Sequence, residues 1–230
     1  MKILVFAPHP DDEIIGCGGT MSRCIAEGND VFVCIVTSPK PHIYDNKVAI
    51  ENGWPHIMFP EIKASHEIIG IKETFFLQFP CVLLENEPRN VVNGKISQVI
   101  QDVKPKIVFI PHFGDMQKDH TIVSESVMVG VRPKYAHVPQ FVYSYECLSE
   151  TEWNIPHTAN SFIPNTFIDI TEYLPQKIEA MSCYKSQLGQ FPDPRSLEAI
   201  QSLAKLRGST AGFKSAEAFS LIREYRRDDK

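Results

Sequence analysis

Residues 2–13 read KILVFAPHPDDE, and this stretch decides the fold. Its first half is an apolar run of the length of a short buried strand, and its second half places four polar side chains directly after that strand. Residues 11–27 then have the apolar spacing of a helix, and VFVCIVT (31–37) is a second apolar run. A strand, a helix and another strand in this order predict a parallel βαβ unit.

The remaining sequence continues this alternation. A proline-rich stretch, residues 38–60, predicts a long loop, which in a compact domain is usually functional or mobile. No repeat, low-complexity tract or linker divides the chain, so we predict one domain over residues 1–230. We expect a three-layer, Rossmann-like α/β fold with a mainly parallel sheet. The further strands that we predict cover 74–79, 107–111, 141–146 and 166–170, and the further helices cover 61–69, 91–103, 119–131, 172–187, 194–207 and 215–227.

The composition limits the partners and the compartment. The chain carries a net charge of −5, which argues against nucleic acid or an anionic membrane as the main partner. No apolar run approaches the roughly 20 residues that a membrane span needs, and the N-terminus predicts a strand rather than a signal peptide. The six cysteines include no CxxC pair and lie mostly in apolar stretches, which favours reduced core cysteines over disulfides or a zinc–thiolate site. We therefore expect a cytoplasmic protein.

Two polar clusters follow two of the predicted strands. The first is HPDDE (9–13), directly after the first strand, and the second is HFGDMQKDH (112–120), directly after IVFIP (107–111). In open α/β sheets the ligand crevice lies outside the carboxyl ends of the strands. Two clusters far apart in sequence are therefore expected to meet at one place. Their convergence is a stronger indication of a site than either cluster alone.

The residue types of these clusters fit a zinc ion. One of Asp11 and Asp12 could simply cap the following helix, but capping requires neither His9 nor a second acid. Zinc binds histidine nitrogen and carboxylate oxygen, and adjacent acids in a turn point in different directions, so one can bind the metal while the other faces a metal-bound water. His120 offers a third ligand, although a lone histidine at a helix start is more often a surface residue. Three protein ligands and an open position are typical of a catalytic zinc, which activates water near neutral pH.

These motifs resemble those of the PIG-L/LmbE-like family of zinc N-deacetylases. HPDDE is followed by IIGCGGT (14–20), and an element similar to D-x-H-x-D-H follows a later strand at 115–120. The resemblance covers nearly the whole chain, and RGSTAGFKSAEAF (207–219) is similar to bacterial members that act on sugars. It implies a Rossmann-like fold, one zinc ion, and removal of an acetyl group from an N-acetylglucosamine-type sugar, free or linked to a nucleotide or conjugate. This small molecule is the partner that we expect, together with further copies of the chain in a homo-oligomer.

The resemblance also assigns roles to individual residues. It implies that His9, Asp12 and His120 bind the zinc and that Asp11 is the general base. Asp119 would orient a ligand or a partner histidine, as metal sites usually require.

Two departures from the family pattern stand out. Gln117 occupies the position of a family histidine that is thought to stabilise the oxyanion or protonate the leaving amine, and glutamine can donate a hydrogen bond but has no proton to supply. Either Asp11 works as both base and acid, or another group such as His112 takes over. A strand-end histidine with a backbone partner is an equally good interpretation of His112. The family also often has an arginine shortly before the glutamate corresponding to Glu61, and residues 50–60 contain none.

Three further positions lie near the expected crevice. Thr37 and Ser38 end the second strand, where substrate contact and simple strand termination are both compatible with their residue types. The glycine-rich run 16–19 does not have the spacing of a nucleotide-phosphate loop. We interpret it as close packing of a helix on the sheet.

We therefore predict hydrolysis of the acetamide of an amino sugar. One alternative is a metal amidase with a non-sugar N-acyl substrate, which would differ only in the loops at 38–60 and 147–161. Another is a non-catalytic member that binds a sugar or a metal, which Gln117 and the missing arginine favour. The intact HPDDE argues against that second alternative, because a binding module needs no free carboxylate beside an open metal position.

Overall fold

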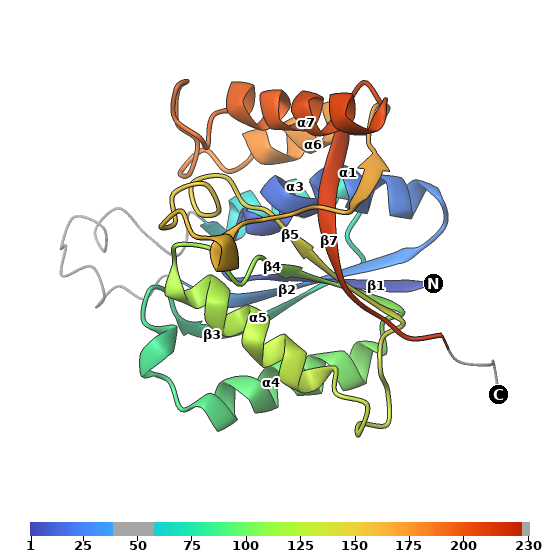
Figure 1. Cartoon of the computed structure of the whole chain (residues 1–230), viewed down its shortest axis with the longest axis vertical. Helices are drawn as coiled ribbons and strands as arrows, with labels where there is room; N and C mark the ends of the chain where they lie inside the picture. The colour runs from blue at the N-terminus through green and yellow to red at the C-terminus, as the bar shows by residue number, and fades with distance from the viewer. Residues whose placement is uncertain (39–57, 227–230) are drawn as a thin grey trace.

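Two layers of helices enclose a central sheet in the computed structural model, which describes residues 1–38 and 58–226 (Figure 1). Seven described strands follow the order β3-β2-β1-β4-β5-β7-β6 across that sheet. The strands are β1 (Lys2–Ala7), β2 (Asp30–Ser38), β3 (Glu73–Pro80), β4 (Ile107–Pro111), β5 (Phe141–Tyr145), β6 (Thr166–Asp169) and β7 (Ala216–Glu224). The helices are α1 (Asp12–Ala26), α3 (Met58–Ile69), α4 (Arg89–Val103), α5 (Lys118–Gly130), α6 (Leu174–Ser182) and α7 (Leu197–Ala211), with short 3₁₀ turns η1 (Leu84–Asn86) and η2 (Thr158–Asn160).

The sheet is mainly parallel, as the alternation of strands and helices predicts. Strands β3, β2, β1, β4 and β5 run parallel to one another, and β7 pairs antiparallel with both β5 and β6. Helices α1, α3, α6 and α7 cover one face, and α4 and α5 cover the other (Figure 1). The three-layer α/β prediction is therefore confirmed.

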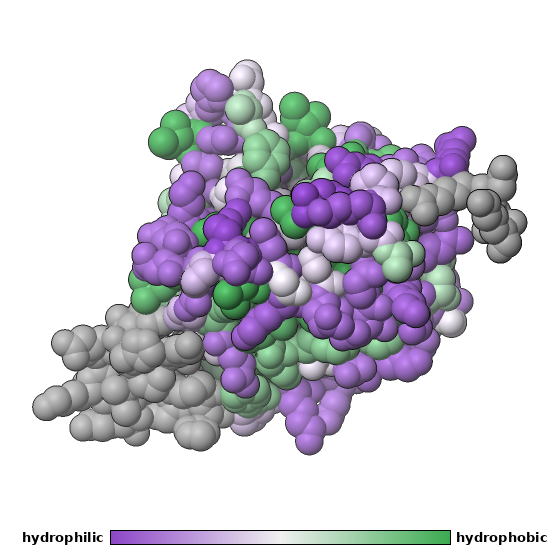
Figure 2. All heavy atoms as spheres, turned by 90° about the horizontal axis from the view of Figure 1, so that it is seen from below, coloured by the Kyte–Doolittle hydropathy of each residue, from purple (hydrophilic) through white to green (hydrophobic). Residues whose placement is uncertain are grey.

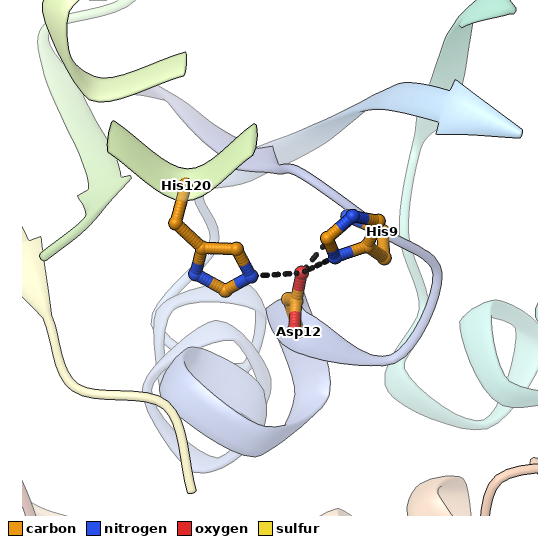
Figure 3. Close-up of side chains that lie close together, drawn as sticks. All are labelled: His9, Asp12 and His120. Atoms are coloured by element: carbon orange, nitrogen blue, oxygen red, sulfur yellow. Dashed lines mark hydrogen bonds and ion pairs between the residues drawn. The ribbon is translucent and has the colours of Figure 1, made fainter. Parts of the chain in front are cut away.

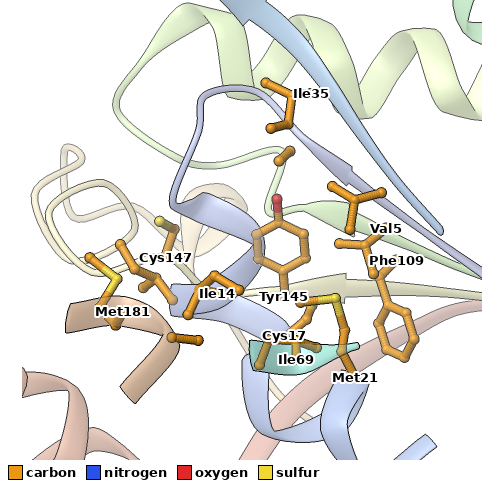
Figure 4. Packing of buried hydrophobic residues seen from close by; sticks show 14 of the residues in the cluster. Val5, Ile14, Cys17, Met21, Ile35, Ile69, Phe109, Tyr145, Cys147 and Met181 are labelled. Atoms are coloured by element: carbon orange, nitrogen blue, oxygen red, sulfur yellow. The ribbon is translucent and has the colours of Figure 1, made fainter. Parts of the chain in front are cut away.

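Both faces of the sheet are buried, because side chains alternate between the two sides of a strand. In β1, Ile3 and Val5 join the core under α1, whereas Leu4 and Phe6 join the core under α4 and α5. Figure 4 shows Val5 packed with side chains of α1 and β5 in the first of these cores. Full burial of one such side chain contributes about 1.5–3 kcal/mol, so β1 is fixed as a central strand and its carboxyl end has a defined position.

A glycine-rich surface of α1 allows the helix to pack closely on the sheet, as the sequence predicts. A Cβ at Gly16 would lie 2.3 Å from Cδ2 of Tyr145, and one at Gly19 would lie 2.7 Å from Cδ1 of Ile170. Tyr145 also donates its hydroxyl to the carbonyl oxygen of Phe6 at 2.8 Å. The contact therefore joins α1 to β5 and, through the tyrosine hydroxyl, to β1, the strand that leads into the first polar cluster.

The C-terminal segment corrects one prediction. We expect a helix over 215–227, but residues Ala216–Glu224 form the strand β7. The alanines and glutamates of this segment favour a helix, yet intrinsic propensity is a weak preference that tertiary contacts override. Here β5 and β6 pair with both edges of the segment, and Phe219 is fully buried against Phe109. Backbone pairing and core packing together determine the strand.

Several element boundaries differ from the predicted ones. The predicted loop at 38–60 begins after Ser38, which still belongs to β2, and α3 begins at Met58; residues 39–57 lie outside the described part of the chain. Helix α6 ends at Ser182, and α7 continues to Ala211.

The surface and the cysteines agree with the composition. The face in Figure 2 is mostly hydrophilic, with smaller hydrophobic areas scattered across it. No described helix is long and apolar enough to cross a membrane. All six cysteines are free; Cys17, Cys34 and Cys147 are buried in the core, as predicted, whereas Cys24, Cys81 and Cys183 are only partly buried.

Candidate functional site

The two polar clusters meet at the carboxyl ends of β1 and β4. His9 lies in the turn after β1, Asp12 begins α1, and His120 lies in the first turn of α5. One ligand atom from each of these residues lies within 4.8 Å of the other two (Figure 3). All three side chains are buried, with at most 7% exposure. The convergence predicted for HPDDE and the second cluster is therefore present.

The carboxylate of Asp12 lies at the centre of this group. Its Oδ2 is 3.2 Å from Nδ1 of His9 and 3.2 Å from Nε2 of His120, and it accepts the backbone N–H of His9 at 2.8 Å. Nε2 of His120 makes no hydrogen bond of good geometry, so its contact with this oxygen is an ion pair (Figure 3). Two imidazole nitrogens and a carboxylate oxygen that face one another fit a divalent cation with nitrogen and oxygen ligands.

The outer nitrogen of each histidine is held by a second carboxylate. Nε2 of His9 donates to Oδ2 of Asp119 at 3.0 Å, and Nδ1 of His120 donates to Oδ2 of Asp115 at 2.8 Å. Asp119 also accepts the backbone N–H of Val82 at 2.7 Å, so its own position is fixed. These bonds direct the remaining lone pair of each ring towards Asp12, an arrangement that is usual around metal ligands.

The charges within the cluster shift the pKa of each member towards its charged form. Burial lowers the pKa of His120, but Asp12 and Asp115 outweigh it and raise that pKa to about 9. Burial also lowers the pKa of His9, whereas Asp119 and Asp12 raise it well above its usual value. For Asp12, burial raises the pKa, but His120 and His9 hold it well below its usual range. A cation bound here would replace protons on the imidazoles, so binding would weaken as the pH falls.

Asp11 directly precedes Asp12 and lies in a strained turn. Its φ of 102° is unusual for a residue other than glycine, and its backbone N–H donates to Oε2 of Glu13 at 3.1 Å. Oε1 of Glu13 accepts the hydroxyl of Tyr184 at 2.6 Å and lies 3.1 Å from Nε2 of His66. The acid at position 13 thus stabilises the conformation that presents Asp11.

An arginine that the sequence did not indicate holds one oxygen of Asp11. Nη1 of Arg195 donates to Oδ2 of Asp11 at 2.8 Å, and its Nε donates to Oγ of Ser149 at 2.8 Å. Oδ1 of Asp11 is buried and has no partner. Burial raises the pKa of Asp11 well above its usual value, and the charge of Arg195 opposes that rise. One oxygen is therefore anchored and the other is available to a ligand.

Gln117 and His112 occupy different surroundings. Gln117 precedes α5, and its Oε1 is buried without a partner. Nε2 of His112 donates to the backbone carbonyl of Asn160 at 2.9 Å, and its ring contacts Phe113 and Phe162. The backbone partner matches the second interpretation of His112, and the residue is not one of the three whose ligand atoms converge.

Thr37 and Ser38 lie at the end of β2. Thr37 donates both its hydroxyl and its backbone N–H to the carbonyl of Pro8, at 2.8 and 3.0 Å. Thr37 therefore fixes the turn that carries His9, and Ser38 is half-buried beside it. Contact of either side chain with a substrate stays a prediction.

A separate cavity of about 650 Å³ lies between α3 and β3. It is lined by apolar side chains such as Phe59 and Phe76 together with His66, and it includes none of the predicted site residues. The convergent polar groups lie instead at the ends of β1 and β4.

Comparisons with known proteins agree with this location. The family model described as PIG-L: GlcNAc-PI de-N-acetylase matches residues 4–130, a range that includes both polar clusters. The chain is 28% identical to a probable N-acetyl-alpha-D-glucosaminyl L-malate deacetylase 2 of Bacillus cereus, over 80% of this chain and 83% of that protein. It is 25% identical to a diacetylchitobiose deacetylase of Thermococcus kodakarensis, over 96% and 83%. The crystal structure of a conserved protein from Thermus thermophilus superimposes with a TM-score of 0.77 at 25% identity, covering 98% of this chain and 96% of that one.

Proposed function

Because this chain belongs to the PIG-L (GlcNAc-PI de-N-acetylase) family, we propose that it is a metal-dependent hydrolase that removes the acetyl group from an N-acetylglucosamine-type sugar. The two relatives named above are named as deacetylases. The substrate in each name contains an N-acetylglucosamine unit. One observation carries the proposal: a His–Asp–His cluster lies beside Asp11, a carboxylate that keeps one oxygen unpaired. A hydrolase of this type requires that combination of groups.

We propose that the metal is zinc and that His9, Asp12 and His120 bind it. Their nitrogen and oxygen donors suit zinc, and Nε2 of His120, which is buried without a hydrogen bond, supports a ligand role for that atom. Zinc in such a site supplies a Lewis acid for the amide carbonyl and lowers the pKa of water. Asp115 and Asp119 keep the two imidazoles oriented through their hydrogen bonds.

The remaining steps belong to residues of the chain. Asp11 takes a proton from the attacking water through its unpaired Oδ1, while Arg195 keeps the carboxylate in place through Oδ2. Gln117 donates a hydrogen bond from its amide to the substrate carbonyl. Thr37 and Ser38 are proposed to border the sugar at the end of β2. Action in the cytoplasm, which the six free cysteines support, and a homo-oligomeric state are further proposals taken from the sequence.

The test is acetate release from a panel of amides. The panel contains N-acetylglucosamine, diacetylchitobiose, an N-acetylglucosaminyl malate, a sugar nucleotide and an N-acetyl amino acid. We expect release from at least one sugar, loss of activity with a chelator, and recovery on addition of zinc. Release from the N-acetyl amino acid alone would support a non-sugar amidase instead. Tight zinc binding without any turnover would support a non-catalytic member.

A further inference from the structure

Hydrolysis of an amide requires a proton donor as well as a base, because the departing nitrogen is a poor leaving group until it is protonated. Gln117 has no proton to give. His112 is engaged with the backbone carbonyl of Asn160. The site therefore needs another acid, unless Asp11 returns the proton that it has taken.

Another carboxyl, that of Glu150, lies in the turn after β5 and next to the predicted site. The backbone carbonyl of Glu150 accepts the N–H of Met116, the residue before Gln117, at 3.1 Å. Oε1 of Glu150 is 3.8 Å from Nη2 of Arg195, the residue that anchors Asp11. The turn after β5 thus contacts the segment that carries Gln117 and the arginine that holds the base.

The same turn reaches the metal ligands. Cys147 donates its thiol to Oδ1 of Asp12 at 3.2 Å, and Thr151 donates its hydroxyl to Oδ1 of Asp115 at 2.6 Å. The backbone N–H groups of Glu150 and Thr151 both donate to the carbonyl of Cys147, which makes the turn compact. Glu150 is therefore positioned by a rigid segment that is itself bonded to the site.

One oxygen of Glu150 has no partner. The residue is 5% exposed, and its Oε2 is buried without a hydrogen bond. Of the nine such side-chain atoms in the described part of the chain, those of titratable groups belong to Asp11, His120 and Glu150. By contrast, both oxygens of the buried Glu61 and Glu217 accept hydrogen bonds. An unpaired buried carboxyl oxygen is thus a property of this site and not of buried acids generally.

The surroundings of Glu150 favour its neutral form. Burial raises its pKa, the negative charge of Asp12 adds to that rise, and the positive charges of His120, His9 and Arg195 oppose it. The net shift is upward. These groups act on Glu150 from α5, the turn after β1, α1 and the segment before α7. A neutral carboxyl can donate a proton, which an ionised one cannot.

We propose that Glu150 is the acid that protonates the departing amine, a role that rests on the proposed deacetylase function. The oxygen of water forms a bond to the acetyl carbon while Asp11 takes one proton of that water. The C–N bond then breaks with its electron pair on nitrogen, and Glu150 gives its proton to that nitrogen. The products are acetic acid and the free amine, with Asp11 protonated and Glu150 ionised. Proton exchange with solvent returns both carboxyls to their starting forms.

The experiment compares Glu150→Gln with the parent and with Glu152→Gln. Glu152 is exposed in the same turn and accepts the N–H of Ser149 at 2.6 Å, a bond that glutamine retains. Both variants therefore replace a carboxyl group of the same turn by an amide. The measurements are kcat and KM against pH, with the N-acetyl sugar that the parent hydrolyses fastest, and the zinc content of each protein.

We expect Glu150→Gln to lower kcat by about 10²–10⁴-fold with KM and zinc content unchanged. An acid must be protonated to act, so the parent loses activity as the pH rises through the pKa of Glu150. Glutamine does not titrate, so this alkaline limb disappears in Glu150→Gln. Glu152→Gln keeps the parental rates and limb. Glu150→Asp, which retains a carboxyl on a shorter side chain, recovers part of kcat together with the limb.

Three results would overturn the role of Glu150. The first is a Glu150→Gln protein with parental kcat and an unchanged profile. The second is a rise in KM without a fall in kcat, which would make Glu150 a substrate contact. The third is loss of the alkaline limb in His112→Gln while Glu150→Gln keeps it, which would assign the acid to His112. A parent protein that releases no acetate from any sugar would instead overturn the proposed function, and this inference with it.

Discussion

Two buried charged clusters contact helix α1, and they differ in how completely their polar atoms are paired. In the first, Nζ of Lys177 donates to Oε1 of Glu217 at 2.6 Å and to the carbonyl of Ile15 at 2.7 Å, and the oxygens of Glu217 also accept the N–H groups of Gly19 and Thr20. In the second, after the ends of β1, β4 and β5, Asp11, His120 and Glu150 each keep a buried atom that makes no hydrogen bond.

The difference separates a structural ion pair from a site. Burying charge is expensive in both clusters, because the groups lose water. In the Lys177–Glu217 cluster, protein atoms replace that water. In the strand-end cluster they do so only in part, and we propose that a cation and a substrate complete the pairing. Burial and charge alone would not have distinguished the two clusters.

The largest effect is expected for His120→Ala. The variant should lose bound zinc and lower turnover by about 10³-fold or more, because two remaining ligands hold a catalytic ion weakly and the metal supplies several kcal/mol. Elemental analysis and acetate release are the measurements. Stoichiometric zinc in this variant would show that the third ligand lies elsewhere, with His112 as the first residue to examine.

Asp11→Asn should remove the base and spare the metal. We expect kcat to fall by about 10²–10⁴-fold while zinc content stays at the parental value. Asp12→Asn provides the comparison, because it should lose zinc. If Asp11→Asn lost the metal and Asp12→Asn retained it, the roles of the two acids would be reversed.

Lys177→Met examines the fully paired cluster. It should lower the free energy of unfolding by about 3–5 kcal/mol, because Glu217 stays buried without its counter-ion. The folded variant should keep its zinc and its kcat. Urea unfolding provides the measurement, and the exposed Lys205→Met, expected to change stability by less than about 0.5 kcal/mol, is the control. A selective loss of kcat at unchanged stability would mean that this cluster takes part in the reaction.

A smaller effect is expected for Asp119→Asn, which weakens the support of His9. Zinc affinity should fall by about 10–100-fold, as is usual when an outer partner of a metal ligand is replaced. Competition with a chelator of known affinity measures this change. Asp102 is an exposed residue of α4, away from the site. Asp102→Asn makes the same substitution there and should leave the zinc affinity unchanged. An equal affinity in all three proteins would mean that Asp119 does not orient His9.

The parallel part of the fold could be predicted because its signals are local. Buried strands such as β1 and β2 are continuous apolar runs, and each is followed by polar or turn-forming residues. Strand β7 could not be predicted in the same way. Its conformation depends on pairing with β5 and β6, which lie far away in the sequence, and its own alanines and glutamates favour a helix.

The residues of the site likewise differ in whether the sequence indicates them. His9, Asp11, Asp12 and His120 follow strand ends in two short motifs, so their convergence follows from the topology of a parallel sheet. Arg195 is 184 positions from its partner Asp11, and no spacing connects the two. Glu150 lies in the turn after β5, and no motif in the sequence marks it. Asp115, five residues before His120, is the one whose spacing could have indicated its role.

Zinc titration of the metal-free protein tests the central claim most directly. The protein is stripped with a chelator, and acetate release from its best N-acetyl sugar is followed as zinc is added, in the parent and in His120→Ala. We predict no activity without metal, a linear rise that ends at one zinc per chain in the parent, and no rise over the same range in His120→Ala. Full acetate release by the metal-free parent, or an equal rise in the variant, would contradict the account.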